Sequence, residues 1–200
     1  MKEEELILKK ISIAEKTVLE LNQKGSLKKL PEQLARQIAQ FYETKARNRL
    51  QTAKIVYEES KKNNQYTDYS ETVAAAYYAM YYIVHSYLAA VYQTKIKEDL
   101  RGVHAITHNL VLYYLVKTNK LAKHLYEEYL QTFQTTTATL TIDQFQKKAY
   151  TYAEKYDDSR AARETFTYKT TPSIEEYHAK QAISTAEEFI NTIRQLINAI

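Results

Sequence analysis

Apolar residues recur along most of the chain at alternating spacings of three and four, the period of an amphipathic α-helix. The pattern predicts a first helix over Glu3–Asn22, ended by Gly25 and Ser26, and a second that begins near Pro31 and fades in the polar run 61–65. The core-facing stripe expected in the second helix consists of Leu34, Ile38 and Phe41, continued by Ala46, Leu50, Ala53 and Tyr57.

The middle of the chain predicts the most regular helix. Asp68 and Glu71 form a capping box at its start, with the Asp68 carboxylate accepting a backbone N–H. Its apolar stripe consists of Val73, Tyr77, Met80, Val84, Tyr87 and Val91, which makes it the expected core helix. A loop is predicted over Lys95–Ile106, followed by a helix that Thr107 caps and that ends near Val116.

Three more helices are predicted towards the C-terminus. The first spans about Leu121–Gln134, before the threonine-rich stretch 135–141, and places Leu125, Tyr129 and Phe133 on one side. The second opens at a capping box over 141–144 and runs towards Arg163. The third starts at Ile174, and its expected buried stripe consists of Ile183, Ala186, Ile190, Ile193 and Ile197.

Composition strengthens the helical interpretation. The 200 residues include two glycines and two prolines, whereas a sheet protein needs such turn residues every ~8 to 12 residues. The sequence therefore predicts an all-α fold. The chain contains no cysteine, which excludes disulfides and cysteine nucleophiles. The acidic N-terminus does not resemble a signal peptide, so a cytoplasmic protein is expected. The uncharged stretch Thr72–Thr94 carries six tyrosines, which favours a buried bundle helix over a membrane span.

Several segments occur in the order and spacing of one known family. They are 45–53 (KARNRLQTA), 76–82 (AYYAMYY), Thr107-His108 leading to 116–121 (VKTNKL), and 163–168 (RETFTY) followed by 186–190 (AEEFI). Over Leu34–Ile200 the chain resembles small prokaryotic HEPN domains in which the Tyr-Tyr-Ala-Met helix is central. The resemblance implies an up-and-down antiparallel helical bundle over residues 31–200, with residues 1–30 as an N-terminal helical extension. It also implies a homodimer, in a family that includes RNA-cleaving toxins paired with small nucleotidyltransferase antitoxins.

Active ribonucleases of that family place a histidine shortly after an arginine. Metal-independent RNA cleavage needs a group that titrates near neutrality and a fixed cation for the phosphate. At the matching position this chain has Arg163 and then Tyr168, with no histidine between them, and tyrosine has a pKa of about 10. The two residues are the catalytic candidates, and a structural ion pair is the alternative for Arg163. The missing histidine predicts a weak or inactive nuclease.

Other candidates lie outside that motif. Arg101 and His108 have a comparable spacing in an earlier element, where His108 can contact phosphate or serve only as a cap or packing residue. Asp158 and Arg160, with the neighbouring Asp157 and Arg163, can bind a cation or a nucleotide phosphate, or can form a local ion-pair cluster. His104 and His108 have metal-ligand spacing, but no nearby carboxylate completes a site, so neither a metal nor a cofactor is expected.

The chain contains nineteen tyrosines, and its net charge is +4. Tyrosines such as Tyr78 can stack on the bases of single-stranded nucleic acid, or can serve the core and a subunit interface. The expected function is an RNA- or nucleotide-associated component of a toxin–antitoxin or defence module. Two alternatives stay open, an active metal-independent ribonuclease toxin and a scaffolding helical protein without a nucleic-acid partner.

Overall fold

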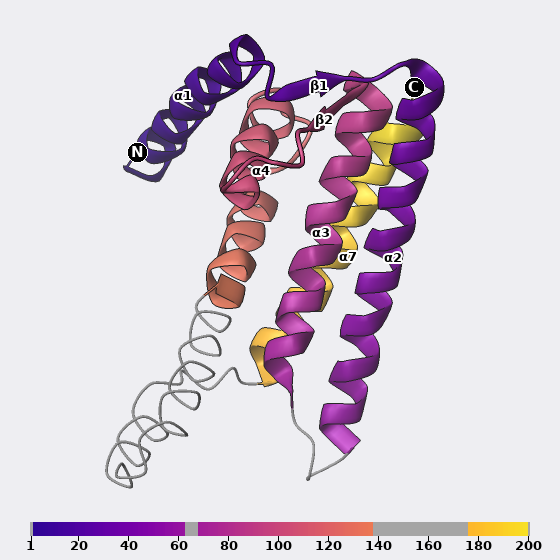
Figure 1. Cartoon of the computed structure of the whole chain (residues 1–200). Coiled ribbons are helices and arrows are strands. Elements are labelled where there is room, and N and C mark those ends of the chain that lie inside the picture. Colours follow the sequence, from indigo (N-terminus) through magenta and orange to yellow (C-terminus); the bar gives the residue numbers. More distant parts are fainter. Residues whose placement is uncertain (1, 63–67, 138–175, 200) are drawn as a thin grey trace, which may run out of the picture.

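A computed structural model describes residues 2–62, 68–137 and 176–199, which form an antiparallel bundle of helices with one two-stranded sheet (Figure 1). The elements in chain order are α1 (Lys2–Gln23), β1 (Leu27–Lys29), α2 (Glu32–Lys62), α3 (Tyr69–Tyr92), β2 (Thr94–Ile96), α4 (Val103–Val111), the π-helical η1 (Leu112–Val116), a helix over residues 123–137, and α7 (Glu176–Asn198). The predicted all-α bundle is therefore confirmed. The helix predicted from residue 141 towards Arg163 lies outside the described residues.

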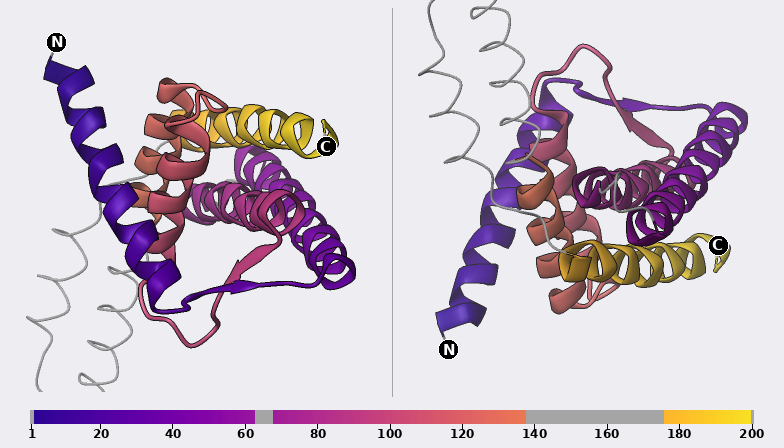
Figure 2. Two further views of the ribbon diagram at one scale, coloured as in Figure 1. Left: turned by 90° about the horizontal axis from the view of Figure 1, so that it is seen from above. Right: turned by 90° about the horizontal axis from the view of Figure 1, so that it is seen from below.

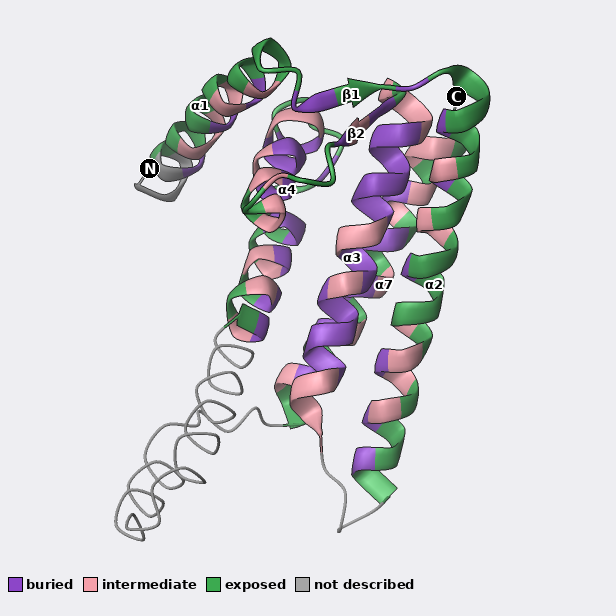
Figure 3. Ribbon diagram, viewed as in Figure 1, coloured by how far each residue is buried: buried purple, intermediate pink, exposed green. Residues whose placement is uncertain are grey.

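Helix α3 is the central rod of the bundle, as its apolar stripe predicts. The Asp68 carboxylate accepts the backbone N–H of Glu71 at 2.9 Å, which satisfies one of the free donors at the start of the helix. Gln93 ends the helix in the left-handed conformation. Helices α2 and α7 both pack against α3, and α3 is buried along most of its length (Figure 3).

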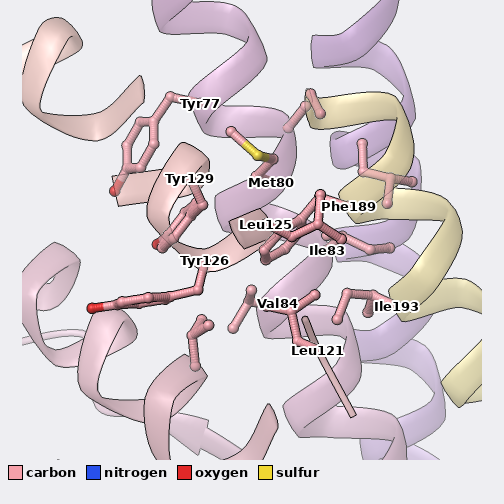
Figure 4. Close-up of a cluster of buried hydrophobic side chains, with 14 of the residues drawn as sticks. Tyr77, Met80, Ile83, Val84, Leu121, Leu125, Tyr126, Tyr129, Phe189 and Ile193 are labelled. Carbon is pink, nitrogen blue, oxygen red and sulfur yellow. The ribbon is translucent and has the colours of Figure 1, made fainter. Parts of the chain in front are cut away.

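The core lies where α3 meets α7 and the helix over residues 123–137. Tyr77, Met80 and Ile83 of α3 face Tyr129 and Phe189 of the other two helices (Figure 4). All five side chains are fully buried. Phe189 was not in the stripe predicted for the last helix, in which Ile183 and Ile197 are only half-buried. Burial of these large side chains accounts for most of the stabilisation in this region.

The predicted stripe of α2 is wrong in its first half. Leu34 and Phe41 are exposed, at 41% and 54% of their surface, and the helix instead buries a row of small residues. This row consists of Ala35, Ala39, Ala46 and Ala53. Small side chains let the backbones of α2 and α3 approach closely, and the Ser86 hydroxyl of α3 donates to the Ala39 carbonyl at 2.9 Å. Because α2 and α3 pack closely, α2 turns its alanine face towards α3 rather than the face with larger side chains.

The segment predicted as a loop over 95–106 contains two elements. Strand β2 pairs antiparallel with β1, with Leu27 opposite Ile96, so composition did not exclude a short sheet. Helix α4 begins at Val103, after Gly102 in the left-handed conformation, rather than at Thr107. The Thr107 hydroxyl donates to the Val103 carbonyl inside the helix. The sequence alone does not distinguish a threonine in this role from an N-cap residue.

Helix α1 lies against α4 and η1, on the side of the bundle away from α7 (Figure 2). Ile7, Ala14 and Val18 of α1 belong to the same hydrophobic cluster as the bundle core. Glu15 also forms an ion pair with Lys117, at 2.6 Å between carboxylate and ammonium. In the described part of the chain, no helix combines the length and apolar character that crossing a bilayer requires.

Candidate functional site

The four tyrosines at the middle of α3 divide into an inner and an outer group. Tyr77 is 1% exposed, whereas Tyr78, Tyr81 and Tyr82 are half-buried. A helix turns by 100° per residue, so neighbouring positions cannot all face the core. We call Tyr77, His85, His104, His108 and Tyr129 the inner aromatic cluster. We call Phe41, Tyr42, Lys45, Arg49, Tyr78 and Tyr82 the outer aromatic surface, and Tyr81 lies between the two groups.

Ring contacts across three helices hold the inner aromatic cluster together. The Tyr77 hydroxyl lies 2.8 Å from Nδ1 of His104, a hydrogen bond between α3 and α4. The rings of Tyr77 and Tyr129 stack with centroids 5.8 Å apart. The His108 ring lies 4.9 Å from Tyr129. His85 is fixed by the Thr107 hydroxyl, 3.3 Å from its Nε2.

Burial keeps the inner histidines uncharged near neutral pH. It lowers the pKa of His85 and of His108 from 6.5 to about 4, with a smaller effect from His104. Burial also lowers the pKa of His104 and raises that of Tyr77. His108 is 8% exposed, and its Nε2 is buried without a hydrogen-bond partner among the described residues. Of its two predicted roles, the geometry favours packing, because the His108 ring is buried against Tyr129 and Phe133.

The outer aromatic surface combines the exposed ring of Phe41 and half-buried tyrosine rings with two exposed cations of α2. The Lys45 ammonium lies 4.7 Å from the centroid of the Phe41 ring and 5.3 Å from that of Tyr82. The Arg49 guanidinium lies 5.8 Å from the Tyr78 ring. The rings of Tyr42 and Tyr82 stack across α2 and α3, with an interplanar angle of 23°. Each cation–π contact at such an exposed site contributes roughly 0.5 to 1 kcal/mol.

The two cations differ in how far other charges neutralise them. Arg49 lies 3.7 Å from the Glu71 carboxylate, a half-exposed pair of the kind that contributes little in water. Lys45 has no carboxylate partner in the parts of the chain that are described. The surface therefore presents positive charge directly beside aromatic rings that are partly exposed.

This arrangement suits single-stranded nucleic acid. Bases stack on exposed aromatic rings with about 1 to 3 kcal/mol per base, and lysine or arginine between the rings attracts the backbone phosphates. Stacking needs a ring with one free face, which the buried Tyr77 and Tyr129 lack. Binding at this surface needs no protonated histidine.

Only part of the predicted site falls in the described residues. Tyr78 belongs to the outer aromatic surface. Arg101 is exposed just before α4, and the described structure shows no contact between it and His108. The remaining candidates, which are Asp158, Arg160, Arg163 and Tyr168, lie outside the described residues. The predicted cleft that joins Arg163 to the Tyr77 helix therefore stays a prediction.

Sequence reasoning missed the residues of α2 that complete the surface. Phe41, Lys45 and Arg49 recur every four residues, as do Tyr78 and Tyr82 on α3, and this spacing places each set on one helix face. That signal was present in the sequence. It was overlooked because Phe41 was assigned to the core.

Metal ligation has no support in the described residues, where no three side chains of metal-ligating type lie close together. Comparison of the chain with protein-family profiles, with curated protein sequences and with solved structures returned no match.

Proposed function

We propose that this protein binds single-stranded RNA on its outer aromatic surface and acts as an RNA-associated component rather than as an efficient nuclease. The observation that carries the proposal is the interleaving of Lys45 and Arg49 with the rings of Phe41, Tyr78 and Tyr82. A basic groove with aromatic side chains is the usual platform for single strands, because every base has a face that can stack.

The protonation states of the histidines support binding over cleavage. His85 and His108 are buried, and their lowered pKa values leave them without the proton that a general acid would donate at neutral pH. His104 is engaged by the Tyr77 hydroxyl. Cleavage through Arg163 and Tyr168 is the alternative, and it predicts RNA degradation that persists in EDTA.

The experiment is a titration of a fluorescently labelled single-stranded RNA with the full chain in EDTA, followed by anisotropy. The variant Tyr78→Leu/Tyr82→Leu removes both rings, and Tyr78→Phe/Tyr82→Phe is the matched control that keeps them. We expect the leucine variant to bind at least ~10-fold more weakly and the phenylalanine variant to bind like the wild type. Equal RNA binding by all three proteins would refute the placement of the binding site on this surface. No binding by any of them would refute the proposal and favour the scaffolding alternative.

The same samples test the nuclease alternative. Intact RNA after long incubation is the expected result. Cleavage by the wild type that Arg163→Ala abolishes would instead identify an active metal-independent ribonuclease.

The biological setting that we propose follows from the resemblance to HEPN domains. In that setting the protein is a cytoplasmic homodimer within a toxin–antitoxin or defence module, and a small nucleotidyltransferase is its antitoxin partner. Light scattering of the purified chain tests the dimer. Co-purification with a nucleotidyltransferase encoded in the adjacent gene tests the partner, and a monomer that binds no such enzyme would refute this setting.

A further inference from the structure

A polar groove lies between α2 and α7, away from the face of α2 that carries the outer aromatic surface. It encloses ≈ 170 Å³ and is lined by charged side chains of both helices, with Leu50 and Ile190 supplying the apolar part of its wall. Pockets for drug-sized ligands are about 300 to 1,000 Å³, so this groove suits a smaller molecule.

Two ion pairs across the groove already satisfy its carboxylates. Glu43 accepts from Arg194, with Oε1 at 2.9 Å from Nε and 2.8 Å from Nη2. Glu187 pairs with the Lys54 ammonium at 2.5 Å. Both pairs join α2 to α7, which fixes the positions of these four side chains on the walls.

Arg47 is the cation of the groove that remains without a carboxylate partner among the described residues. Glu43 lies one turn earlier on the same helix, a spacing that allows a pair, but its carboxylate contacts Arg194 instead. Three cations and two carboxylates therefore leave one unbalanced positive charge beside an apolar wall. A guanidinium presents two parallel N–H donors that match the two oxygens of a carboxylate.

We propose that this groove binds a small monocarboxylic acid with an apolar body. The carboxylate takes both N–H donors of Arg47, and the hydrocarbon part lies on Leu50 and Ile190. A single negative charge balances the groove, whereas a phosphate monoester brings close to two and leaves one uncompensated. This site is separate from the outer aromatic surface, and the proposal does not rest on RNA binding.

The test is an NMR titration of the full chain with hexanoate and, as a neutral probe of the same shape, hexanamide. We expect saturable binding of hexanoate, with shifts confined to residues around the groove, and binding of hexanamide at least ~10-fold weaker. Arg47→Ala should weaken hexanoate binding by a similar factor. Arg36→Ala is the matched control, because Arg36 is an exposed arginine of α2 that pairs with Glu32 outside the groove.

Three results would overturn the proposal. They are absence of saturable hexanoate binding at millimolar concentration, equal binding of acid and amide, and equal binding by Arg47→Ala and wild type. Tighter binding of inorganic phosphate than of hexanoate in the same groove would overturn the choice of a carboxylate. A Tyr82→Leu variant, which alters only the outer aromatic surface, should bind hexanoate normally.

Discussion

The inner aromatic cluster and the outer aromatic surface both include tyrosines of α3, but these tyrosines lie in opposite environments. Tyr77 has helices on every side, so its ring is buried and its hydroxyl is committed to His104. Tyr82, five residues later, has α2 on one side only and keeps part of its ring open next to Lys45. The number of helices packed around a tyrosine ring therefore decides whether the ring belongs to the core or keeps a surface that a ligand can contact.

The stability cost of removing a ring should separate the two groups most strongly. Tyr77→Ala leaves a cavity in the core, and we expect it to lower the free energy of unfolding by about 3 to 5 kcal/mol. Tyr82→Ala removes a half-exposed ring and should cost about 1 kcal/mol or less. Urea denaturation followed by circular dichroism measures both values. Similar losses for the two variants would show that the division into inner and outer groups is wrong.

Acid should destabilise the protein through the inner cluster. The unfolded chain binds protons at His85 and His108 near the ordinary pKa of 6.5, but the folded chain binds them only near 4. Between these values the unfolded state holds more protons, so stability falls as pH falls. We expect a loss of roughly 2 kcal/mol per histidine between about pH 7 and pH 5, measured by urea denaturation. A flat profile over this range would contradict the burial of the two rings.

Replacing one inner histidine by an apolar residue should remove part of that acid sensitivity. His108→Leu eliminates a buried nitrogen that has no hydrogen-bond partner in the described part of the chain, so its stability near neutral pH should lie within about 1 kcal/mol of the wild type. The variant should also lose about half of the pH dependence. His108→Asn, which keeps a buried polar group, is the control and should be clearly less stable. A large loss in the leucine variant at neutral pH would indicate that Nε2 has a partner.

Removal of the two cations of the outer aromatic surface should weaken RNA binding and should have the smallest effect on the free energy of unfolding. Replacing Lys45 and Arg49 by alanine removes two contacts to phosphate, and each contributes about 0.7 to the dependence of log K on log salt for a single strand. The slope should therefore fall by about 1.4, with little change in the free energy of unfolding. Lys16 of α1 is exposed and distant from this surface, so Lys16→Ala is the control and should leave the slope unchanged.

The regular, strongly periodic parts of the fold could be predicted from the sequence. The α3 stripe, apart from the half-buried Val91, and the Asp68 part of the capping box were correct because both signals act locally. The other part of the box was wrong, since the backbone N–H of Asp68 donates to the Ser60 hydroxyl at 2.9 Å and Glu71 pairs with Arg49 instead. The α2 stripe was wrong because alanine is a weak signal of burial, although it permits the closest packing of two helices. The sheet was missed because the strands that form it are three residues long and pair across a long separation in sequence.

The candidate site, like the fold, could be predicted from the sequence only in part. Tyr78 was identified because the tyrosines stand together in the sequence. Lys45 contacts both Phe41 of its own helix and Tyr82 of α3, and Arg49 contacts Tyr78 of α3. The environment of His108 also depends on tertiary contacts, since Tyr129 and Phe133 come from another helix. The spacing of four residues places each set on one face of its helix, but the sequence pattern does not give which face of α2 meets which face of α3.

The most direct test of the central claim is photo-crosslinking of single-stranded RNA that contains 4-thiouridine, with the crosslinked residues identified by mass spectrometry. The outer aromatic surface predicts crosslinks at Tyr42, Tyr78 and Tyr82, and none at the buried Tyr77 or Tyr129. Crosslinks confined to other regions of the chain, or no crosslinks above those of an unrelated helical protein, would contradict the account.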